Sequence, residues 1–315
     1  MKPFVVSVVG PTAVGKSKLG VEIARRFNGE VISGDSMQIY RTMDIGTAKV
    51  TPEETCGIPH HMIDIKNPEE EFSVAEFQRK VQALIYDISA RGKLPVLVGG
   101  TGLYIQATLY DFNFSKEKKD ERVIRRLEAE LEKYGNEEMY RKLLEADPKQ
   151  AEKIHPNNVR RVLRALEVYE TTGKGLSNYK EEQHPSSPFQ PILIGLEMDR
   201  EELYERINRR VDQMIVEGLL EEVRQLYERG LEDAQSMKAI GYKEFVPYFK
   251  GQYDLERAIE LLKRNSRRYA KRQYTYFRNK LEVSWYPVRE NDYEEKFATI
   301  LSDLAGMMDD QLERY

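Results

Sequence analysis

The sequence predicts an α/β protein whose core is a doubly wound parallel sheet containing a P-loop, interrupted by an all-helical insertion domain. Apolar, β-branched runs alternate with amphipathic helical segments before residue 110, and an apolar run returns near residue 190. Between them, residues from about 115 to 185 are helix-rich and highly charged and show no strand pattern. We therefore expect an α/β core of residues 1–114 and 189–290 with a helical C-terminal part, an insertion over 115–188, and a C-terminal tail over 291–315.

The first elements form a phosphate-loop unit. "FVVSVV" (4–9) is a continuous apolar run, as expected for a strand buried on both faces of a parallel sheet. "GPTAVGKS" (10–17) matches G-x-x-x-x-G-K-[ST], and an amphipathic helix follows from Lys16 to about Phe27. In such a unit, backbone N–H groups hold phosphate oxygens, Lys16 neutralises charge and the Ser17 hydroxyl binds Mg²⁺. The motif alone does not say which phosphate is bound.

Strands over 30–35 and 94–100 continue the sheet, with an amphipathic helix over about 73–91 between them. The first of these strands places Asp35 at its carboxyl end, beside the phosphate loop, where ligands bind in open α/β sheets. Position alone leaves Asp35 open as a metal ligand, a proton acceptor or a helix N-cap. The strand "LPVLVGG" ends in glycines instead of the Mg²⁺-binding aspartate of a triphosphatase, so ATP hydrolysis is poorly supported.

The insertion contains two predicted helices, over 120–135 and 157–173, and each ends at a glycine. A loop over 183–188 and an apolar strand over 190–199 return the chain to the core. Beyond residue 200 the sequence is mostly helical.

Composition restricts the partners. The 315 residues carry a net charge of −4, yet residues 238–280 hold twelve Lys or Arg against four Asp or Glu, a local charge of +8. Such a patch on an acidic protein indicates a polyanion that binds at one place. The single cysteine, Cys56, excludes an internal disulfide, and no Cys/His cluster has zinc spacing. No apolar run approaches the ~18–20 residues of a membrane span, so we expect a cytoplasmic protein, and nothing calls for more than a monomer.

Eight sequence blocks occur in the order of a known family, and the series is "GPTAVGKS" (10–17), "ISGDSMQIYRTMDIGTAK" (32–49), "PHHMIDI" (59–65), "VLVGGTGLYIQA" (96–107), "IHPNNVRRVLRALEVYETTGK" (154–174), "RINRRVDQMIVEGLLEEV" (206–223), "MKAIGYKEF" (237–245) and "RRYAKRQYTYFR" (267–278). From about residue 4 to residue 280 the chain closely resembles the bacterial tRNA dimethylallyltransferases, also called tRNA isopentenyltransferases or IPP transferases. The resemblance implies transfer of a dimethylallyl group from dimethylallyl diphosphate to the exocyclic N6 amine of an adenosine. That adenosine lies just 3′ of the anticodon in tRNAs that read UNN codons, and the products are isopentenyladenosine and diphosphate.

The resemblance also implies roles for individual residues. Asp35 accepts the proton of the adenine amine, Thr101 contacts the oxygen that bridges the prenyl and diphosphate groups, and Arg210 reaches the diphosphate. Arg206 and Arg209 are interpreted as residues of a solvated helix face. The diphosphate cradle, completed by Mg²⁺ on Ser17, consists of Gly10, Thr12, Ala13, Val14, Gly15, Lys16 and Ser17.

The target adenosine must leave its stack to reach Asp35. The expected tRNA contacts lie after the second strand, on the insertion and in the basic region, and they are Asp35, Ser36, Met37, Gln38, Thr101, Arg160, Arg161, Lys238, Gly241, Tyr242, Lys243, Arg268, Lys271 and Arg272. The aromatic residues Tyr269, Tyr274, Tyr276 and Phe277 are expected to pack in the core instead of stacking on bases.

Three alternative functions compete with tRNA prenylation. An adenylate isopentenyltransferase would prenylate free AMP or ATP, but it would need neither the insertion nor the basic region. A P-loop small-molecule kinase would transfer phosphate, and a non-catalytic tRNA-binding protein would not need Asp35 and Thr101 beside a phosphate loop.

Overall fold

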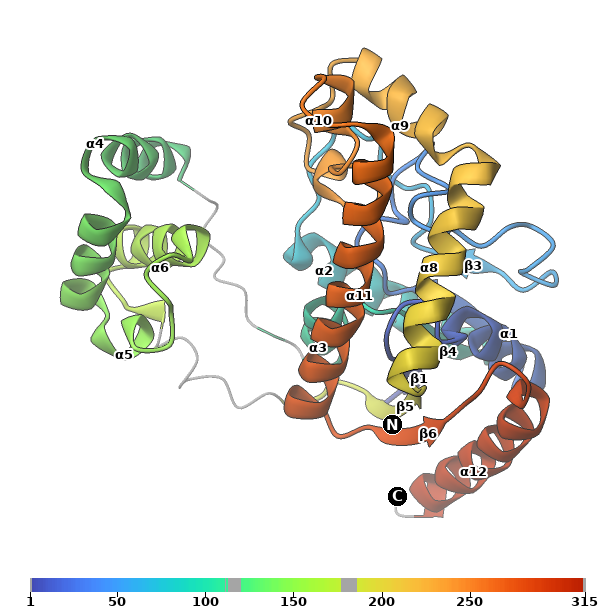
Figure 1. Cartoon of the computed structure of the whole chain (residues 1–315). Coiled ribbons are helices and arrows are strands. Elements are labelled where there is room, and N and C mark those ends of the chain that lie inside the picture. Colours follow the sequence, from blue (N-terminus) through green and yellow to red (C-terminus); the bar gives the residue numbers. More distant parts are fainter. Residues whose placement is uncertain (1, 111, 113–119, 177–185, 314–315) are drawn as a thin grey trace. The chain divides into compact units, whose positions relative to one another are not determined.

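The computed structural model describes residues 2–110, 112, 120–176 and 186–313. Internal contacts divide the chain into two units, one made of Met1–Asp111 and Ser187–Tyr315 and the other of Phe112–Ser186 (Figure 1). The second unit covers most of residues 115–188, the range of the expected insertion. The predicted boundary at 114/115 and residues 183–185 of the predicted loop lie outside the described residues. No helix in the described part of the chain has the length and apolar character needed to cross a membrane.

The larger unit is built on a parallel sheet of six strands. In spatial order the strands are β3 (His60–His61), β2 (Gly29–Ser33), β4 (Leu94–Val98), β1 (Phe4–Val9), β5 (Gln190–Glu197) and β6 (Ser284–Pro287). β1 is central, because Val6 pairs with Val96 of β4 on one side and with Ile192 of β5 on the other. The doubly wound parallel sheet is therefore confirmed, whereas the two short edge strands were not predicted.

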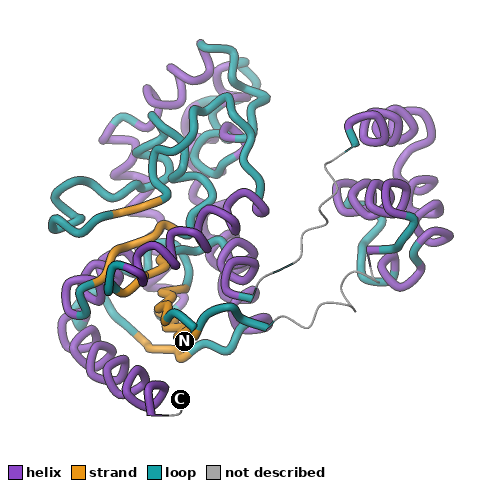
Figure 2. Tube along the Cα trace, turned by 180° about the vertical axis from the view of Figure 1, so that it is seen from behind, coloured by secondary structure: helices purple, strands orange, loops and turns teal. Residues whose placement is uncertain are grey.

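Helices cover both faces of this sheet, which explains the unbroken apolar runs of the central strands. Val5 and Val9 belong to one hydrophobic cluster, while Val6 and Val8 belong to another. Figure 2 shows the strands of this unit bordered by helices. The helices are α1 (Lys16–Arg26), α2 (Val74–Ala90), α3 (Gly102–Leu109), α8 (Arg200–Glu217), α9 (Leu219–Glu228), η1 (Ser236–Lys238), α10 (Val246–Phe249), α11 (Leu255–Lys280) and α12 (Tyr293–Glu313).

The segment expected to be a tail contains α12. Phe297, Ile300 and Leu304 follow one another at helical spacing and are at most 4% exposed. They join the hydrophobic cluster that also contains Leu19 and Ile23 of α1. The end of the chain is thus an integral layer of the core.

The insertion unit contains α4 (Glu121–Ala146), α5 (Pro148–Ala151) and α6 (Val159–Thr172). Gly135 interrupts α4 with φ 79° and ψ 177°, and Gly173 ends α6 in the left-handed conformation, so both predicted helix ends are confirmed. The unit has its own small core, which includes Leu127, Met139, Leu143, Val162 and Leu166.

Glu30 is a buried carboxylate at the start of β2 and is only 2% exposed. Its two oxygens accept hydrogen bonds from Arg91 at 2.5 and 2.9 Å, and they also contact Lys93 and His61, each at 2.7 Å. The hydrogen bonds from Arg91 are the largest cause that holds the pKa of Glu30 well below its usual range. These four residues form an ion cluster at the end of the sheet opposite Asp35.

Glu30→Gln is expected to lower the free energy of unfolding at pH 7 by about 1–3 kcal/mol, because it leaves three donors without a charged acceptor. Urea denaturation measures this effect. Because the pKa of Glu30 is depressed on folding, its contribution is present above the ordinary value of 4.5 and is lost as the pH falls through the folded pKa. Glu22→Gln, which breaks a surface pair with Arg25, should change stability by less than about 0.5 kcal/mol. Equal effects of the two changes would contradict the inference that the buried Glu30 cluster stabilises the fold more than a surface ion pair does.

Candidate active site

Two adjoining cavities lie at the carboxyl ends of the central strands. A polar cavity of about 740 Å³ is lined by the phosphate loop, by three arginines of α8 and by Asp35. A smaller cavity of about 210 Å³ is mainly apolar. Its apolar lining residues are Ala13, Met37, Ala48, Ile207, Val211, Met214, Ala239, Ile240 and Leu262. Asp35, Arg210 and Tyr269 line both cavities, so they mark the place where a charged group and an apolar group would meet.

The phosphate loop between β1 and α1 is shaped by three residues with positive φ, which are Gly10 (139°), Ala13 (65°) and Gly15 (97°). At Gly10, a Cβ atom would lie 2.6 Å from the carbonyl oxygen of Leu196, so a larger residue cannot occupy this position. Turns of this kind bring successive backbone N–H groups to one side and create an anion-binding concavity. The loop is therefore built to hold an anion.

Lys16 and Arg210 bring positive charge into the polar cavity. Burial, together with the nearby Arg210, lowers the pKa of Lys16 to about 7, while Asp35 acts in the opposite direction. Burial is also the main cause that lowers the pKa of Arg210. A bound anion would stabilise the charged forms of these two cations, which burial disfavours.

Asp35 follows β2, and its Oδ1 atom accepts the backbone N–H of Met37 at 2.8 Å. In the described segment 2–110, no helix begins between the end of β2 and the start of α2 at Val74. Asp35 is therefore not a helix N-cap. Burial is the main cause that raises the pKa of Asp35, whereas Lys16 and Arg210 oppose the rise. A carboxylate with a raised pKa beside a substrate cavity is suited to accept a proton.

Thr101 and Ser36 connect the ends of β4 and β2. The Thr101 hydroxyl accepts the Ser36 backbone N–H at 3.3 Å, and it shares a side-chain hydrogen bond with Tyr269. Thr101 does not itself line either cavity, although both of its partners do in one or the other. Tyr269 was expected in the core, but it faces both cavities, and burial raises its pKa to about 12, so it remains protonated. Phe277, by contrast, is fully buried as expected.

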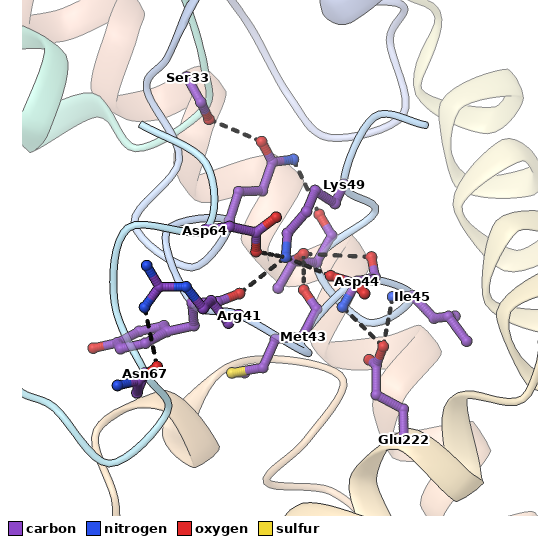
Figure 3. Close-up of polar contacts among 12 residues, drawn as sticks. Ser33, Arg41, Met43, Asp44, Ile45, Lys49, Asp64, Asn67 and Glu222 are labelled. Carbon is purple, nitrogen blue, oxygen red and sulfur yellow. Dashed lines mark hydrogen bonds and ion pairs between the residues drawn. The ribbon is translucent and has the colours of Figure 1, made fainter. Parts of the chain in front are cut away.

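The loop after Asp35 forms one wall of the apolar cavity. It is fixed by ion pairs between the buried Lys49 side chain and two exposed acids, and by hydrogen bonds to Glu222 (Figure 3). Lys49 contacts Asp44 at 2.5 Å and Asp64 at 2.6 Å. Glu222 of α9 accepts the backbone N–H groups of Asp44 and Ile45, each at 2.8 Å.

Gln38 was expected to contact tRNA, yet its amide is engaged within the protein. Its Oε1 accepts the Ser33 hydroxyl at 2.8 Å, and its Nε2 donates to the carbonyls of Thr47 and Ala48, each at 3.2 Å. Its side chain therefore orders the cavity wall.

Arg206 does not lie on a solvated face, which corrects the sequence interpretation. Its Nε donates to the carbonyl of Ala13 at 3.0 Å, and its side chain is 20% exposed. Arg209 is 65% exposed and pairs with Glu290, as a surface residue would. Sequence periodicity could not separate the two arginines, because the loop that binds Arg206 lies 193 positions earlier.

The expected tRNA contacts divide by exposure. The exposed side chains are Arg160, Arg161, Lys238, Lys243, Arg268, Lys271 and Arg272. Tyr242 is fully buried, and its hydroxyl donates to Glu222 at 2.5 Å, while Gly241 is also buried. The Tyr242 side chain is thus a packing element that cannot reach RNA, contrary to the expectation.

Gln273 is a functional candidate that the sequence analysis missed. It is 4% exposed and spans two elements of the site, because its Oε1 accepts the Thr12 N–H at 2.8 Å and its Nε2 donates to Gly100 at 3.0 Å. A Thr12 N–H that binds Gln273 is occupied, so the part of the cradle with free N–H groups begins after Thr12.

Among the described residues, Ser17 of the polar cavity could hold Mg²⁺ only if a phosphate supplied further ligands. The exposed Ser17 lines the polar cavity, and the described residues contain no group of three or more acidic, His or Cys side chains that could hold a metal. One hydroxyl suits Mg²⁺, which retains water and takes its other oxygens from substrate phosphates.

Comparison with known proteins decides the family. A sequence model described as IPP transferase matches residues 38–280. The chain belongs to the IPP transferase family. A tRNA dimethylallyltransferase of Oceanobacillus iheyensis is 58% identical to this IPP transferase over 311 residues, 99% of each chain.

Solved structures agree with this assignment. The crystal structure of a tRNA isopentenylpyrophosphate transferase from Bacillus halodurans is 52% identical, covers 100% of both chains and superposes with a TM-score of 0.77. A eukaryotic dimethylallyltransferase studied while acting on tRNA is 33% identical, with a TM-score of 0.85, over 99% of this IPP transferase and 80% of that chain.

Proposed function

We propose that this IPP transferase moves the dimethylallyl group of dimethylallyl diphosphate to the N6 amine of the adenosine 3′-adjacent to the anticodon in tRNAs that read UNN codons. The products are isopentenyladenosine and diphosphate. One observation carries the proposal most directly: Asp35 lies where a cationic phosphate cavity adjoins an apolar cavity. That arrangement suits a reaction that separates an apolar allylic group from a diphosphate and passes it to a nitrogen.

The leaving group is stabilised at the phosphate loop. Ala13, Gly15, Lys16 and Arg210 line the polar cavity. Their backbone N–H groups and cationic side chains would offset the charge that develops on the diphosphate. The bond between the allylic carbon and the bridging oxygen then breaks, and the electron pair stays on the diphosphate. Mg²⁺ held through Ser17 would supply further charge neutralisation when bound.

The apolar cavity accommodates the dimethylallyl group, and the adenine nitrogen attacks its allylic carbon. The new N–C bond leaves the nitrogen with an excess proton, which Asp35 accepts. Thr101 holds Ser36 and Tyr269, which line the cavities, in place around this position. Its contact with the bridging oxygen stays a prediction from the resemblance. The adenosine reaches Asp35 by leaving its stack, which the exposed basic side chains of α11 assist by binding the RNA backbone.

An incubation with labelled dimethylallyl diphosphate, Mg²⁺ and unmodified tRNA tests the proposal, with AMP and ATP as competing acceptors. We expect label in tRNA alone. Label in AMP or ATP would establish the adenylate isopentenyltransferase activity instead, and phosphate release from ATP without transfer would indicate a kinase-type or hydrolytic enzyme. We further propose a cytoplasmic monomer, since its proposed substrate is tRNA and described residues of a single chain line both cavities.

The insertion is proposed to hold the anticodon arm through Arg160 and Arg161. Both side chains are exposed, and neither has an ion-pair partner among the described residues. The double change Arg160→Glu/Arg161→Glu is expected to weaken tRNA binding about ten- to a hundredfold at low salt and to reduce the slope of log affinity against log salt by about two.

Filter binding over a range of salt concentrations measures both quantities. The matched control is Arg125→Glu/Arg141→Glu, because these arginines of α4 are exposed and already paired with acids of the same helix. It changes the net charge equally. An unchanged salt slope in the Arg160/Arg161 variant, or an equal loss in the control, would contradict the proposed contact.

A further inference from the structure

The carbonyl groups of the phosphate loop need hydrogen-bond donors that the residues of the motif do not all supply. When its N–H groups face the polar cavity, the carbonyls of the same peptide units must point elsewhere and need donors. The Ala13 carbonyl accepts Arg206 Nε at 3.0 Å, and the Val14 carbonyl accepts the Tyr293 hydroxyl at 3.1 Å. Both donors lie far along the chain, in α8 and at the start of α12.

Tyr293 is seated directly on the loop. A Cβ atom at Gly15 would lie 2.9 Å from the Tyr293 ring, so the glycine of the motif leaves the space that this ring uses. The helix that Tyr293 begins is anchored in the core by Phe297 and Ile300. The ring position is therefore set by core packing as well as by the hydrogen bond.

The two donors contact each other, and Glu290 fixes Arg206. Its carboxylate pairs with Arg206 at 2.8 Å, and the Arg206 guanidinium stacks over the Tyr293 ring at 5.5 Å. Glu290 is fixed in turn, since its backbone N–H donates to Glu202 at 2.8 Å. We call this assembly of Arg206, Glu290 and Tyr293 the C-terminal brace.

We infer that the C-terminal brace orients the peptide groups of Ala13 and Val14 so that the loop is preorganised for the diphosphate. The inference rests on the proposed function and extends it to residues after position 280, where the family match ends. Tyr293 is thus a positioning residue for the leaving group. It acts through the loop and does not touch the reacting atoms.

Tyr293→Phe removes the hydroxyl donor and keeps the ring. With inorganic pyrophosphate and Mg²⁺ as the probe, calorimetry is expected to show binding about three- to tenfold weaker than in the wild type. The KM for dimethylallyl diphosphate should rise by a similar factor, while the KM for tRNA and the thermal midpoint stay close to the wild-type values. A rise in the KM for dimethylallyl diphosphate alone distinguishes a positioning role from a loss of stability.

Tyr286→Phe is the matched control, because the Tyr286 hydroxyl donates to Asp303 at 3.0 Å in the same C-terminal region. It should bind pyrophosphate as the wild type does. A second variant, Arg206→Lys, keeps the charge but lacks the Nε donor. Combined with Tyr293→Phe it should lose less than the product of the two single losses, because both donors hold adjacent peptide groups.

Unchanged pyrophosphate affinity in Tyr293→Phe would overturn the inference, and so would an equal loss in Tyr286→Phe. A wild-type protein that binds pyrophosphate but transfers no prenyl group would overturn the proposed function and leave the brace testable. A wild type that does not bind pyrophosphate would overturn both.

Discussion

Asp35→Asn is expected to lower kcat for prenyl transfer by about two to four orders of magnitude, the usual contribution of a general base. The amide keeps the shape of the side chain and its Oδ1 acceptor for the Met37 N–H, which lies at 2.8 Å in the wild type. It cannot accept the proton that the adenine amine must lose. We therefore expect affinities for tRNA and pyrophosphate to change by less than about threefold.

The pH dependence provides a second readout for Asp35. Because burial raises the pKa of Asp35 above the ordinary 3.8, the wild-type rate should fall as the pH drops through that raised pKa and Asp35 becomes protonated. The Asn variant should lack this acidic limb. Single-turnover rates across the pH range measure it, and Asp233→Asn, an exposed acid outside both cavities, serves as the control. Near-normal turnover in Asp35→Asn would exclude the base role.

Lys16→Met is expected to reduce kcat/KM for dimethylallyl diphosphate by about 10²- to 10³-fold, because it removes a cation aimed at the leaving group. In the free protein the pKa of Lys16 is lowered to about 7, so the lysine loses its charge as the pH rises through neutrality. A bound diphosphate favours the charged form. Binding should therefore take up a proton above pH 7, and affinity should fall by up to about tenfold per pH unit there.

Calorimetry with inorganic pyrophosphate, in buffers of different ionisation enthalpy, measures this proton uptake. The uptake by Lys16 should be absent from Lys16→Met, and the difference between the two proteins removes the protonation of pyrophosphate itself. Lys80→Met, on the exposed face of α2, should behave as the wild type. Equal proton uptake with and without Lys16 would show that this lysine does not face the anion.

The central part of the fold could be predicted from the sequence because its signals are local. β1, β4 and β5 are apolar runs buried on both faces, and the helices around them have a regular apolar period. The edge strand β3 consists of two histidines, and β6 is the four-residue segment "SWYP". Segments this short have no period to detect, and they pair only because a neighbouring strand is already in place.

The same limit applies to the residues of the candidate active site, because only those with a local sequence signal could be predicted. Lys16 and Asp35 could be predicted, because a motif and a strand end mark them. Gln273 and Tyr293 could not, because each is one polar side chain in a helix whose partner lies 261 or 279 positions away. Tyr242 illustrates the opposite error, since a resemblance marks it as a tRNA contact although the fold buries it completely.

The bond between Tyr293 and the carbonyl of Val14 has a consequence for biosynthesis. A ribosome adding 5–20 residues per second makes Tyr293 roughly 15 s to 1 min after Val14. Throughout that interval the nascent chain carries the phosphate motif without the residue that steadies it. A product released early by a premature stop codon would include "GPTAVGKS" and Asp35 but would lack the completed loop. Diphosphate binding would therefore stay weakened until the last stage of translation.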